Sequence, residues 1–251
     1  MKKKVATGLA FGRTAKPELA AQAVERAIEK SGIKSPTAVL LFLSAEFASD
    51  PESSIKAAAK AASCTQIIGC SATGIFTEED WILDSPAAAA MIFDDTISLN
   101  VKKNKTHSEL LMTLAAPSAM NSTWLSKPGL RFGGISGDAI GQGPFSVWEN
   151  GKGATQGYCD IAFQNTKTAV AASHGLKRLS DPQKISKTDG YDLVQIDNML
   201  AVNHLETAWQ LLNKQTHDIP LHQIVAIYAS NQTALLQNQY NVASIIACEE
   251  T

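Results

Sequence analysis

The first third of the chain alternates between apolar runs and amphipathic stretches. Residues 5–11 form a short apolar segment that predicts a strand, and from Pro17 to about Lys30 apolar positions recur every three to four residues. A proline suits the first turn of a helix and a glycine its end, so Pro17 and Gly32 mark the boundaries of a predicted helix. The continuous apolar run 38–43 is typical of a strand covered on both faces.

The same alternation continues with a second helix and a third strand. Asp50 followed by Pro51 predicts the start of a helix that ends near residue 63, and residues 66–71 predict another buried strand. Strand, helix, strand, helix and strand in this order are typical of α/β architecture. We therefore predict an α/β fold with α+β elements, whose N-terminal part has parallel βαβαβ order.

The hydrophobic pattern changes in the remainder of the chain. Residues 87–93 and 96–101 predict a hairpin, and residues 108–114 predict a short helix. The second half contains turn signals between short strand-like runs, of which Asp189-Gly190 is the strongest hairpin dipeptide. This pattern predicts a mostly antiparallel sheet, followed by a helix over residues 199–212.

Composition excludes several classes of protein. The 251 residues are 45% hydrophobic with a formal net charge of −2, which excludes a disordered chain and a generally basic surface for nucleic acid or anionic membrane. Every apolar run is far shorter than the roughly 20 residues that span a bilayer. Four cysteines without a C-x-x-C pair favour reduced thiols, so we expect a cytoplasmic protein with neither nucleic-acid nor membrane partners.

A run of small residues directly after the third predicted strand is the most suggestive segment for ligand binding. Residues 69–74, Gly-Cys-Ser-Ala-Thr-Gly, predict a turn in which two hydroxyls and free N–H groups can hold an anion such as a carboxylate. The spacing differs from a nucleophile elbow and from a Walker loop. A tight turn that only packs against a neighbouring element is the alternative. Cys70 is either a buried small hydrophobe or, if its thiolate were stabilised, a nucleophile.

A second glycine-rich segment, residues 133–138, also follows a predicted strand and adds a hydroxyl and a carboxylate. Its alternative interpretation is a flexible loop. The hypothesis is that the two segments face each other across a cleft and bind a small molecule. The predicted ligand-binding residues are Gly69, Cys70, Ser71, Thr73, Gly74, Gly133, Gly134, Ser136 and Asp138.

The remaining candidate groups predict neither a metal site nor a cofactor. His217 and His222 have no third ligand at metal spacing, and His174 beside Gly175 is typical of a turn residue. We therefore expect no catalytic residues, no metal and no cofactor.

Residues 67–74 resemble the FIST domain family, in which a buried strand ends in a similar Gly-Cys-Ser/Thr turn. Further landmarks follow in the family's order over roughly residues 5–212. They are the opening strand and helix and residues 38–44, 133–136, 147–151, 157, 173–175 and 185–188. Two features differ from the family pattern. The family commonly has a Glu soon after the last glycine of the turn, whereas here Ile75-Phe76-Thr77 separates Gly74 from Glu78. We also expect that the chain contains only the beginning of the family's C-terminal region.

The resemblance implies a sensory domain of bacterial signalling proteins that binds a small polar metabolite such as an amino acid, without established catalysis and with a signalling protein as a further partner. It also implies that residues 1–218 form the ligand-sensing domain and that residues 219–251 begin an apparently incomplete C-terminal region. Two other functions stay open: a cysteine-dependent enzyme that uses Cys70, and a protein-interaction scaffold without a small ligand.

Overall fold

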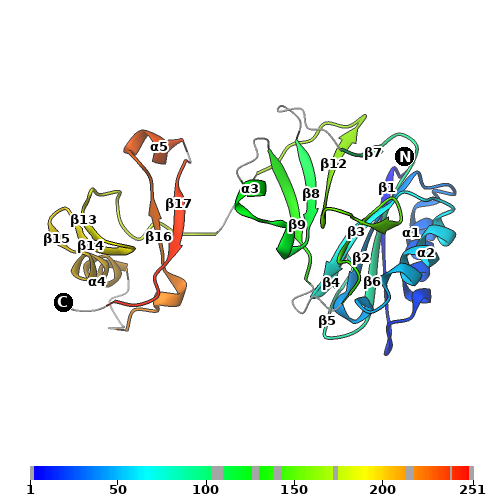
Figure 1. Cartoon of the computed structure of the whole chain (residues 1–251), viewed down its shortest axis with the longest axis horizontal. Helices are drawn as coiled ribbons and strands as arrows, with labels where there is room; N and C mark the ends of the chain where they lie inside the picture. The colour runs from blue at the N-terminus through cyan, green and yellow to red at the C-terminus, as the bar shows by residue number, and fades with distance from the viewer. Residues whose placement is uncertain are drawn as a thin grey trace. The chain divides into compact units, whose positions relative to one another are not determined.

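The computed structural model describes residues 3–102, 110–125, 130–137, 143–171, 175–212, 218–237 and 239–248. The chain divides into two compact units, Met1–Ala171 (unit 1) and Ala172–Thr251 (unit 2), which are described separately. Figure 1 shows the elements of both units. The family resemblance implies a different division, between residues 218 and 219, and that division stays a prediction.

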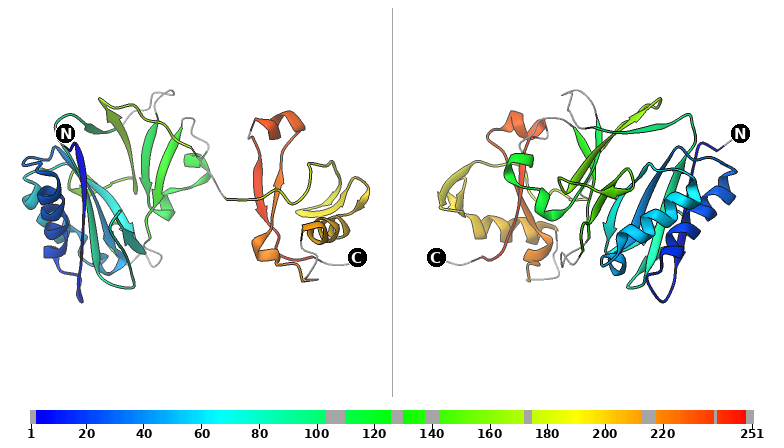
Figure 2. Two further views of the ribbon diagram at one scale, coloured as in Figure 1. Left: turned by 180° about the vertical axis from the view of Figure 1, so that it is seen from behind. Right: turned by 45° about the vertical axis from the view of Figure 1, so that its right-hand side comes forward.

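Unit 1 contains three layers, with a six-stranded sheet in the middle. Helices α1 (Pro17–Ser31) and α2 (Pro51–Ala62) lie side by side against one face of this sheet (Figure 2). A four-stranded sheet packs against the other face. The central sheet has the order β1 (Val5–Phe11), β6 (Ala87–Phe93), β2 (Ala38–Ser44), β3 (Ile67–Ala72), β10 (Val147–Glu149) and β11 (Lys152–Gly153). The second sheet has the order β7 (Ser98–Val101), β12 (Tyr158–Gln164), β8 (Leu111–Ala115) and β9 (Arg131–Ile135).

The predicted fold class is confirmed, because helices and both parallel and antiparallel strand pairs build unit 1. β2 and β3 pair in parallel. β6 lies between β1 and β2 and pairs antiparallel with both. β1 and β2 therefore run in the same direction but are not neighbours in the sheet. The local sequence pattern does not predict this arrangement.

Two local predictions are wrong. β6 and β7 belong to different sheets, so residues 87–93 and 96–101 form no hairpin. Residues 111–115 form strand β8 and not part of a helix, while residues 108 and 109 lie outside the described residues. All five residues of β8 are buried, and burial inside a sheet overrides a weak local preference for a helix.

The predicted helix ends are confirmed. Pro17 occupies the first turn of α1, and Gly32 follows its end with a φ of 73° while its N–H donates to the carbonyl of Ile28. The side chain of Asp50 accepts a hydrogen bond from the N–H of Ser53 and caps α2.

The central strand β2 separates two hydrophobic cores. Val39, Leu41 and Leu43 face the helices, whereas Leu40 and Phe42 face the second sheet. Both faces of β2 are thus covered, as its continuous apolar sequence predicts.

Helix α1 approaches strand β1 so closely that one strand position has no room for a side chain. A Cβ atom on Gly8 would lie 2.1 Å from the carbonyl oxygen of Ala23 and 2.7 Å from the nitrogen of Ala27. Ala20, Ala23 and Ala27 are fully buried at this contact. The short side chains of the helix and the glycine of the strand together set the distance between the two layers.

Unit 2 has smaller elements. A three-stranded antiparallel sheet of β13 (Ile185–Asp189), β14 (Asp192–Ile196) and β15 (Met199–Leu200) precedes helix α4 (Ala201–Leu212), which confirms the Asp189-Gly190 hairpin and most of the expected helix. β16 (Val225–Tyr228) pairs with β17 (Asn241–Ser244), and the short helix α5 (Gln232–Leu236) lies between them in the chain. Among the described residues of this unit, the buried hydrophobic ones are Ala208 and Ala234.

A search of the described helices in both units found none whose length and apolar character would let it cross a membrane.

We predict that Gly8→Ala lowers the unfolding free energy by about 3 kcal/mol, because the new methyl group would collide with backbone atoms that cannot move independently. Urea unfolding followed by circular dichroism measures this change. Gly12→Ala is the matched control, since its Cβ would meet side-chain atoms of Leu19 at 3.5 Å and the carbonyl oxygen of Thr14 at 3.9 Å, which are ordinary contact distances. Equal stabilities of the two variants would contradict the role given to Gly8.

Candidate functional site

The first predicted ligand segment is mostly strand. Gly69, Cys70 and Ser71 lie inside β3 and are buried, and only exposed Thr73 separates β3 from the short strand β4 (Gly74–Phe76). Residues 69–71 therefore belong to the buried strand predicted over residues 66–71, and the turn predicted over residues 69–74 is wrong in its first half. β3 is paired on both sides, with β2 and with β10, and this pairing keeps the chain extended beyond Gly69.

Gly69 serves the packing of the sheet. A Cβ atom at this position would lie 1.7 Å from the carbonyl oxygen of Leu41 and 2.8 Å from Nε1 of Trp148. The absence of a side chain thus lets β2 and the indole of Trp148 approach β3. For this glycine, the packing alternative of the sequence analysis explains the residue.

The structure brings the two glycine-rich segments together at the end of β3. The N–H of Gly137 donates a 2.9 Å hydrogen bond to the carbonyl of Ser71. A Cβ atom on Gly137 would lie 2.3 Å from the nitrogen of Thr73, so the two backbones are in direct contact. The N–H of Ser136 donates to the carbonyl of Ala115, which holds this second segment at the end of β8.

The other members of the second segment are placed differently. Gly133 and Gly134 lie in strand β9 and are exposed, so the expected turn begins later in the chain than predicted. Gly133 has a φ of 147°, and a Cβ atom there would lie 1.9 Å from the carbonyl oxygen of Thr113. Asp138, the predicted carboxylate, lies outside the described residues.

Three serine side chains gather where the segments meet, and we call them the serine cluster: Ser71, Ser136 and Ser146. The N–H of Ser71 donates to the carbonyl of Ser146 at 2.9 Å, which extends the antiparallel pairing of β3 with β10 by one residue pair. Residues directly opposite in such a pair have their side chains on the same face of the sheet. The hydroxyl oxygens of Ser136 and Ser146 are 2.8 Å apart and share a hydrogen bond.

Ser71 carries the most informative atom of the cluster. Its side chain is buried, and its Oγ has no hydrogen-bond partner within the described part of the chain. A buried hydroxyl without a partner costs free energy, and native structures usually supply such a group with a water molecule or a ligand. Within the described residues, the Oγ of Ser71 is therefore available to bond to a water molecule or a ligand.

The cluster lies at the carboxyl ends of the parallel strands β2 and β3. Ligands in α/β proteins commonly bind at this edge of the sheet. Gly143 lies against the segment that follows β2, since a Cβ atom on it would be 2.3 Å from the carbonyl oxygen of Ala48. Residues 143–146 therefore cross from the end of β2 to the end of β3. Sequence reasoning missed Ser146, because its place depends on the register between strands that are distant in the chain.

Cys70 points away from the serine cluster. Its side chain belongs to the core between the two sheets, together with Cys159 and Val147. Burial raises the pKa of the Cys70 thiol to about 12, and it is also the largest cause that raises the pKa of Cys159 to about 12. At neutral pH the Cys70 thiol stays protonated, which is unfavourable for a nucleophile.

The histidines of the chain lie either outside the described residues or in unit 2. Ser173, His174 and His217 lie outside the described residues, and His222 belongs to unit 2. Within the described ranges, no group of three or more His, Cys, Asp or Glu side chains could hold a metal ion.

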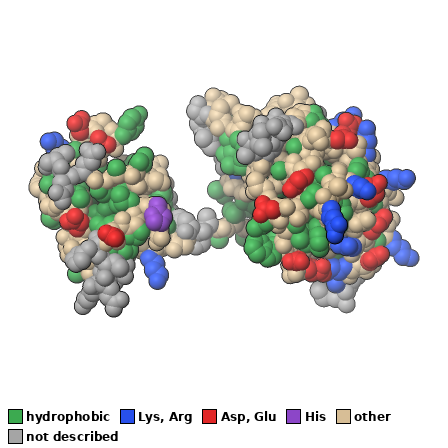
Figure 3. Space-filling view, turned by 90° about the horizontal axis from the view of Figure 1, so that it is seen from below, with side chains coloured by type: hydrophobic (Ala, Val, Ile, Leu, Met, Phe, Trp, Pro, Cys, Tyr) green, Lys and Arg blue, Asp and Glu red, His purple; other side chains and the backbone are tan. Residues whose placement is uncertain are grey.

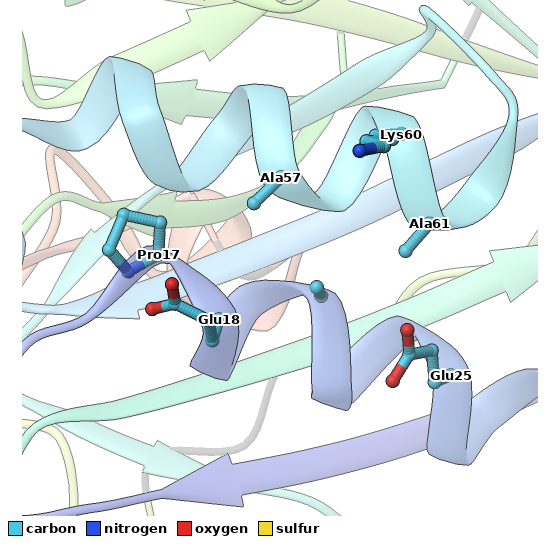
Figure 4. A pocket seen from close by; sticks show the side chains of 7 residues that line it. Pro17, Glu18, Glu25, Ala57, Lys60 and Ala61 are labelled. Atoms are coloured by element: carbon cyan, nitrogen blue, oxygen red, sulfur yellow. The ribbon is translucent and has the colours of Figure 1, made fainter.

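A groove between α1 and α2 has a volume of about 390 Å³ (Figure 4). It belongs to the helix layer and shares no residue with the serine cluster. Its lining consists of Pro17, Glu18, Ala21, Glu25, Ala57, Lys60 and Ala61.

Comparison with known families identifies a match. A family model described as the FIST N domain matches residues 37–199, which is more than half of the chain. The matched region includes β2, β3, β9 and β10 and therefore the whole serine cluster. A search of the curated proteins found no match.

We predict that Gly137→Ala separates the two segments and lowers the unfolding free energy by about 2 kcal/mol, because its methyl group would collide with the backbone of Ala72 and Thr73. Urea unfolding measures the loss. Gly134→Ala is the control, since a Cβ atom there has no neighbour within 4 Å. A Gly137→Ala protein as stable as the control would refute this contact.

We also predict slow labelling of Cys70 and Cys159 by iodoacetamide at pH 8 in the folded protein, and rapid labelling of exposed Cys248. Mass spectrometry of peptides measures each rate, and urea-unfolded protein provides the control in which all cysteines react. Labelling of Cys70 as fast as Cys248 would contradict its burial.

The raised thiol pKa values predict a dependence of stability on pH. The folded pKa of about 12 lies above the ordinary value of 9.0, so the folded state binds these protons more tightly. Their contribution to the unfolding free energy is complete below pH 9 and is lost as the pH rises towards 12. Urea unfolding at pH 8 and pH 10.5 measures how much the unfolding free energy decreases between these pH values. The decrease should be smaller in Cys70→Ala.

Proposed function

Since this chain belongs to the FIST family, whose members are signal-transduction sensory domains, we propose that it senses a small polar metabolite that binds at the serine cluster. The observation that supports this proposal is the buried Oγ of Ser71 without a partner, at the edge of the sheet where α/β proteins commonly bind ligands. An amino acid is the proposed ligand class, because its carboxylate can accept hydrogen bonds from hydroxyl groups.

A second polar atom on the same face of the sheet supports a polar occupant. Nε1 of Trp148 is buried and has no hydrogen-bond partner within the described residues. Trp148 pairs with Gly69, two residues before Ser71, so the indole and the Ser71 hydroxyl lie on the same face. An indole N–H only donates, and a hydroxyl can donate or accept, which suits an oxygen-rich ligand.

The exposed position of Thr73 is suited to the entrance of the proposed site. It follows Ser71 by two residues and touches Gly137 through its backbone nitrogen. We propose that a ligand reaches the buried Ser71 hydroxyl from solvent past this threonine. The expected roles are therefore a buried contact from Ser71 and an outer contact from Thr73.

The proposed action is binding without catalysis. The cysteine-dependent alternative would need a Cys70 thiolate, and a buried thiol with a pKa of about 12 supplies almost none at neutral pH. We also propose a cytoplasmic location, which suits the four free cysteines.

We predict that one or more standard L-amino acids raise the melting temperature of the protein in a thermal-shift screen, because a ligand that binds the folded state stabilises it. The variant Ser71→Ala/Thr73→Ala should then bind the same amino acid about 5- to 30-fold more weakly, as each lost hydrogen bond contributes about 1 kcal/mol. Calorimetry measures both affinities.

Ser98→Ala on β7 is the control, because it removes a hydroxyl from the second sheet without changing the serine cluster. An unchanged affinity in the double variant would remove β3 from the site. A screen without any shift would contradict the proposed ligand class.

A further inference from the structure

A small hairpin directly follows the serine cluster and exposes aromatic side chains. β4 (Gly74–Phe76) pairs antiparallel with β5 (Trp81–Leu83). The inner side chains Ile75 and Ile82 pack with Leu9, Ala87 and Ala89 of the central sheet. One face of the hairpin is therefore fixed to the core of unit 1, and the other face is free of that core.

The outer face of the hairpin is apolar. Phe76 is 79% exposed, and its direct partner Trp81 is 67% exposed. Leu83 is 50% exposed and lies on the same face as Trp81, because side chains alternate along a strand. Single exposed apolar residues are common, but neighbouring ones on a fixed surface are typical of an interaction site. Tryptophan in particular contributes strongly to protein interfaces.

The turn of the hairpin is acidic. Residues 74–84 include four carboxylates and neither Lys nor Arg. Glu79 and Asp80 are exposed at the turn. On the face seen in Figure 3, unit 1 shows hydrophobic side chains with both acidic and basic side chains close to them. An apolar surface beside carboxylates is complementary to an apolar segment that carries positive charges.

The turn is also held in place by polar contacts. Lys30 forms ion pairs with Glu78 and with Glu79, the latter at 2.5 Å, and the hydroxyl of Thr7 donates to Glu78. The hydrogen bond from Lys30 is the largest cause that lowers the pKa of Glu78 to about 2, so this carboxylate stays charged near neutral pH. One lysine offsets one of the four negative charges, and the hairpin stays negative as a whole.

We propose that the outer face of the β4–β5 hairpin docks a basic amphipathic segment of a partner protein. The apolar stripe of that segment covers Phe76 and Trp81, and its Lys or Arg side chains lie beside Glu79 and Asp80. Charge selects this occupant. A symmetric contact with a second copy would bring acidic turns together, and an anionic membrane would repel them.

The test uses the full chain and a fluorescein-labelled synthetic peptide in which Leu recurs every three to four residues and Lys fills the other positions. As a helix, this peptide has one apolar face and one basic face. Fluorescence anisotropy at low salt should show binding, and added salt should weaken it. Phe76→Ser/Trp81→Ser should weaken binding about tenfold or more. Glu79→Gln/Asp80→Asn should weaken it less and reduce its salt dependence.

Two controls keep the test specific. Tyr191→Ser removes a fully exposed aromatic ring from unit 2 and should leave peptide binding unchanged. A peptide with Glu in place of Lys should not bind. Circular dichroism spectra should be the same for all variants, because the substituted side chains are exposed. Melting temperatures should also agree, except in Glu79→Gln/Asp80→Asn, which loses the ion pair between Glu79 and Lys30.

Several results would overturn the proposal. Equal binding by the wild type and Phe76→Ser/Trp81→Ser would exclude the hairpin, and equal binding of the acidic peptide would exclude charge selection. Sedimentation that shows a wild-type dimer abolished by the double variant would identify a second copy as the occupant. Binding to phosphatidylcholine vesicles that the double variant loses would identify a membrane instead. None of these readouts depends on the metabolite proposed for the serine cluster.

Discussion

The backbone of Ser71 joins three separate parts of unit 1, and the arrangement of the candidate site depends on these bonds. Its N–H donates to Ser146, and its carbonyl accepts from Gly137. The residue also pairs with Leu43 of the neighbouring parallel strand. Because these contacts are made by the main chain, they leave the hydroxyl of Ser71 as the part of the residue that can bind something else.

Contacts of this kind require positions without a side chain. Because Gly69 has no side chain, β2 and Trp148 lie directly against its backbone. In the same way, the backbone of Thr73 lies against Gly137, and helix α1 lies against Gly8. Glycine thus has two different roles near the site. At position 69 it brings structural layers together, and at position 137 it brings together the two segments that form the serine cluster.

The sequence predicted the parts of the fold that depend on short-range signals. Pro17, Gly32 and Asp50 mark helix ends through interactions within a few residues, and the Asp189-Gly190 hairpin depends on one turn. The pairing of β6 with β1 and β2 depends on residues far apart in the chain, which is why the expected hairpin of residues 87–101 was wrong. The same limit applies to the site: the glycine segments were recognisable locally, but Ser146 becomes their neighbour only through the register of β10 on β3.

The open side of β9 has a further consequence, for the behaviour of the protein at high concentration. Among the described strands β9 pairs with β8 alone, and its exposed residues Gly133, Gly134 and Ile135 lie at the border of the second sheet. A long, regular border strand would offer its free N–H and carbonyl groups to another molecule and promote aggregation. The φ of 147° at Gly133 interrupts the regular extended geometry, so the border is short and irregular. The backbone conformation that fits β9 against Thr113 thereby also makes the strand a poor template for intermolecular β-sheet growth.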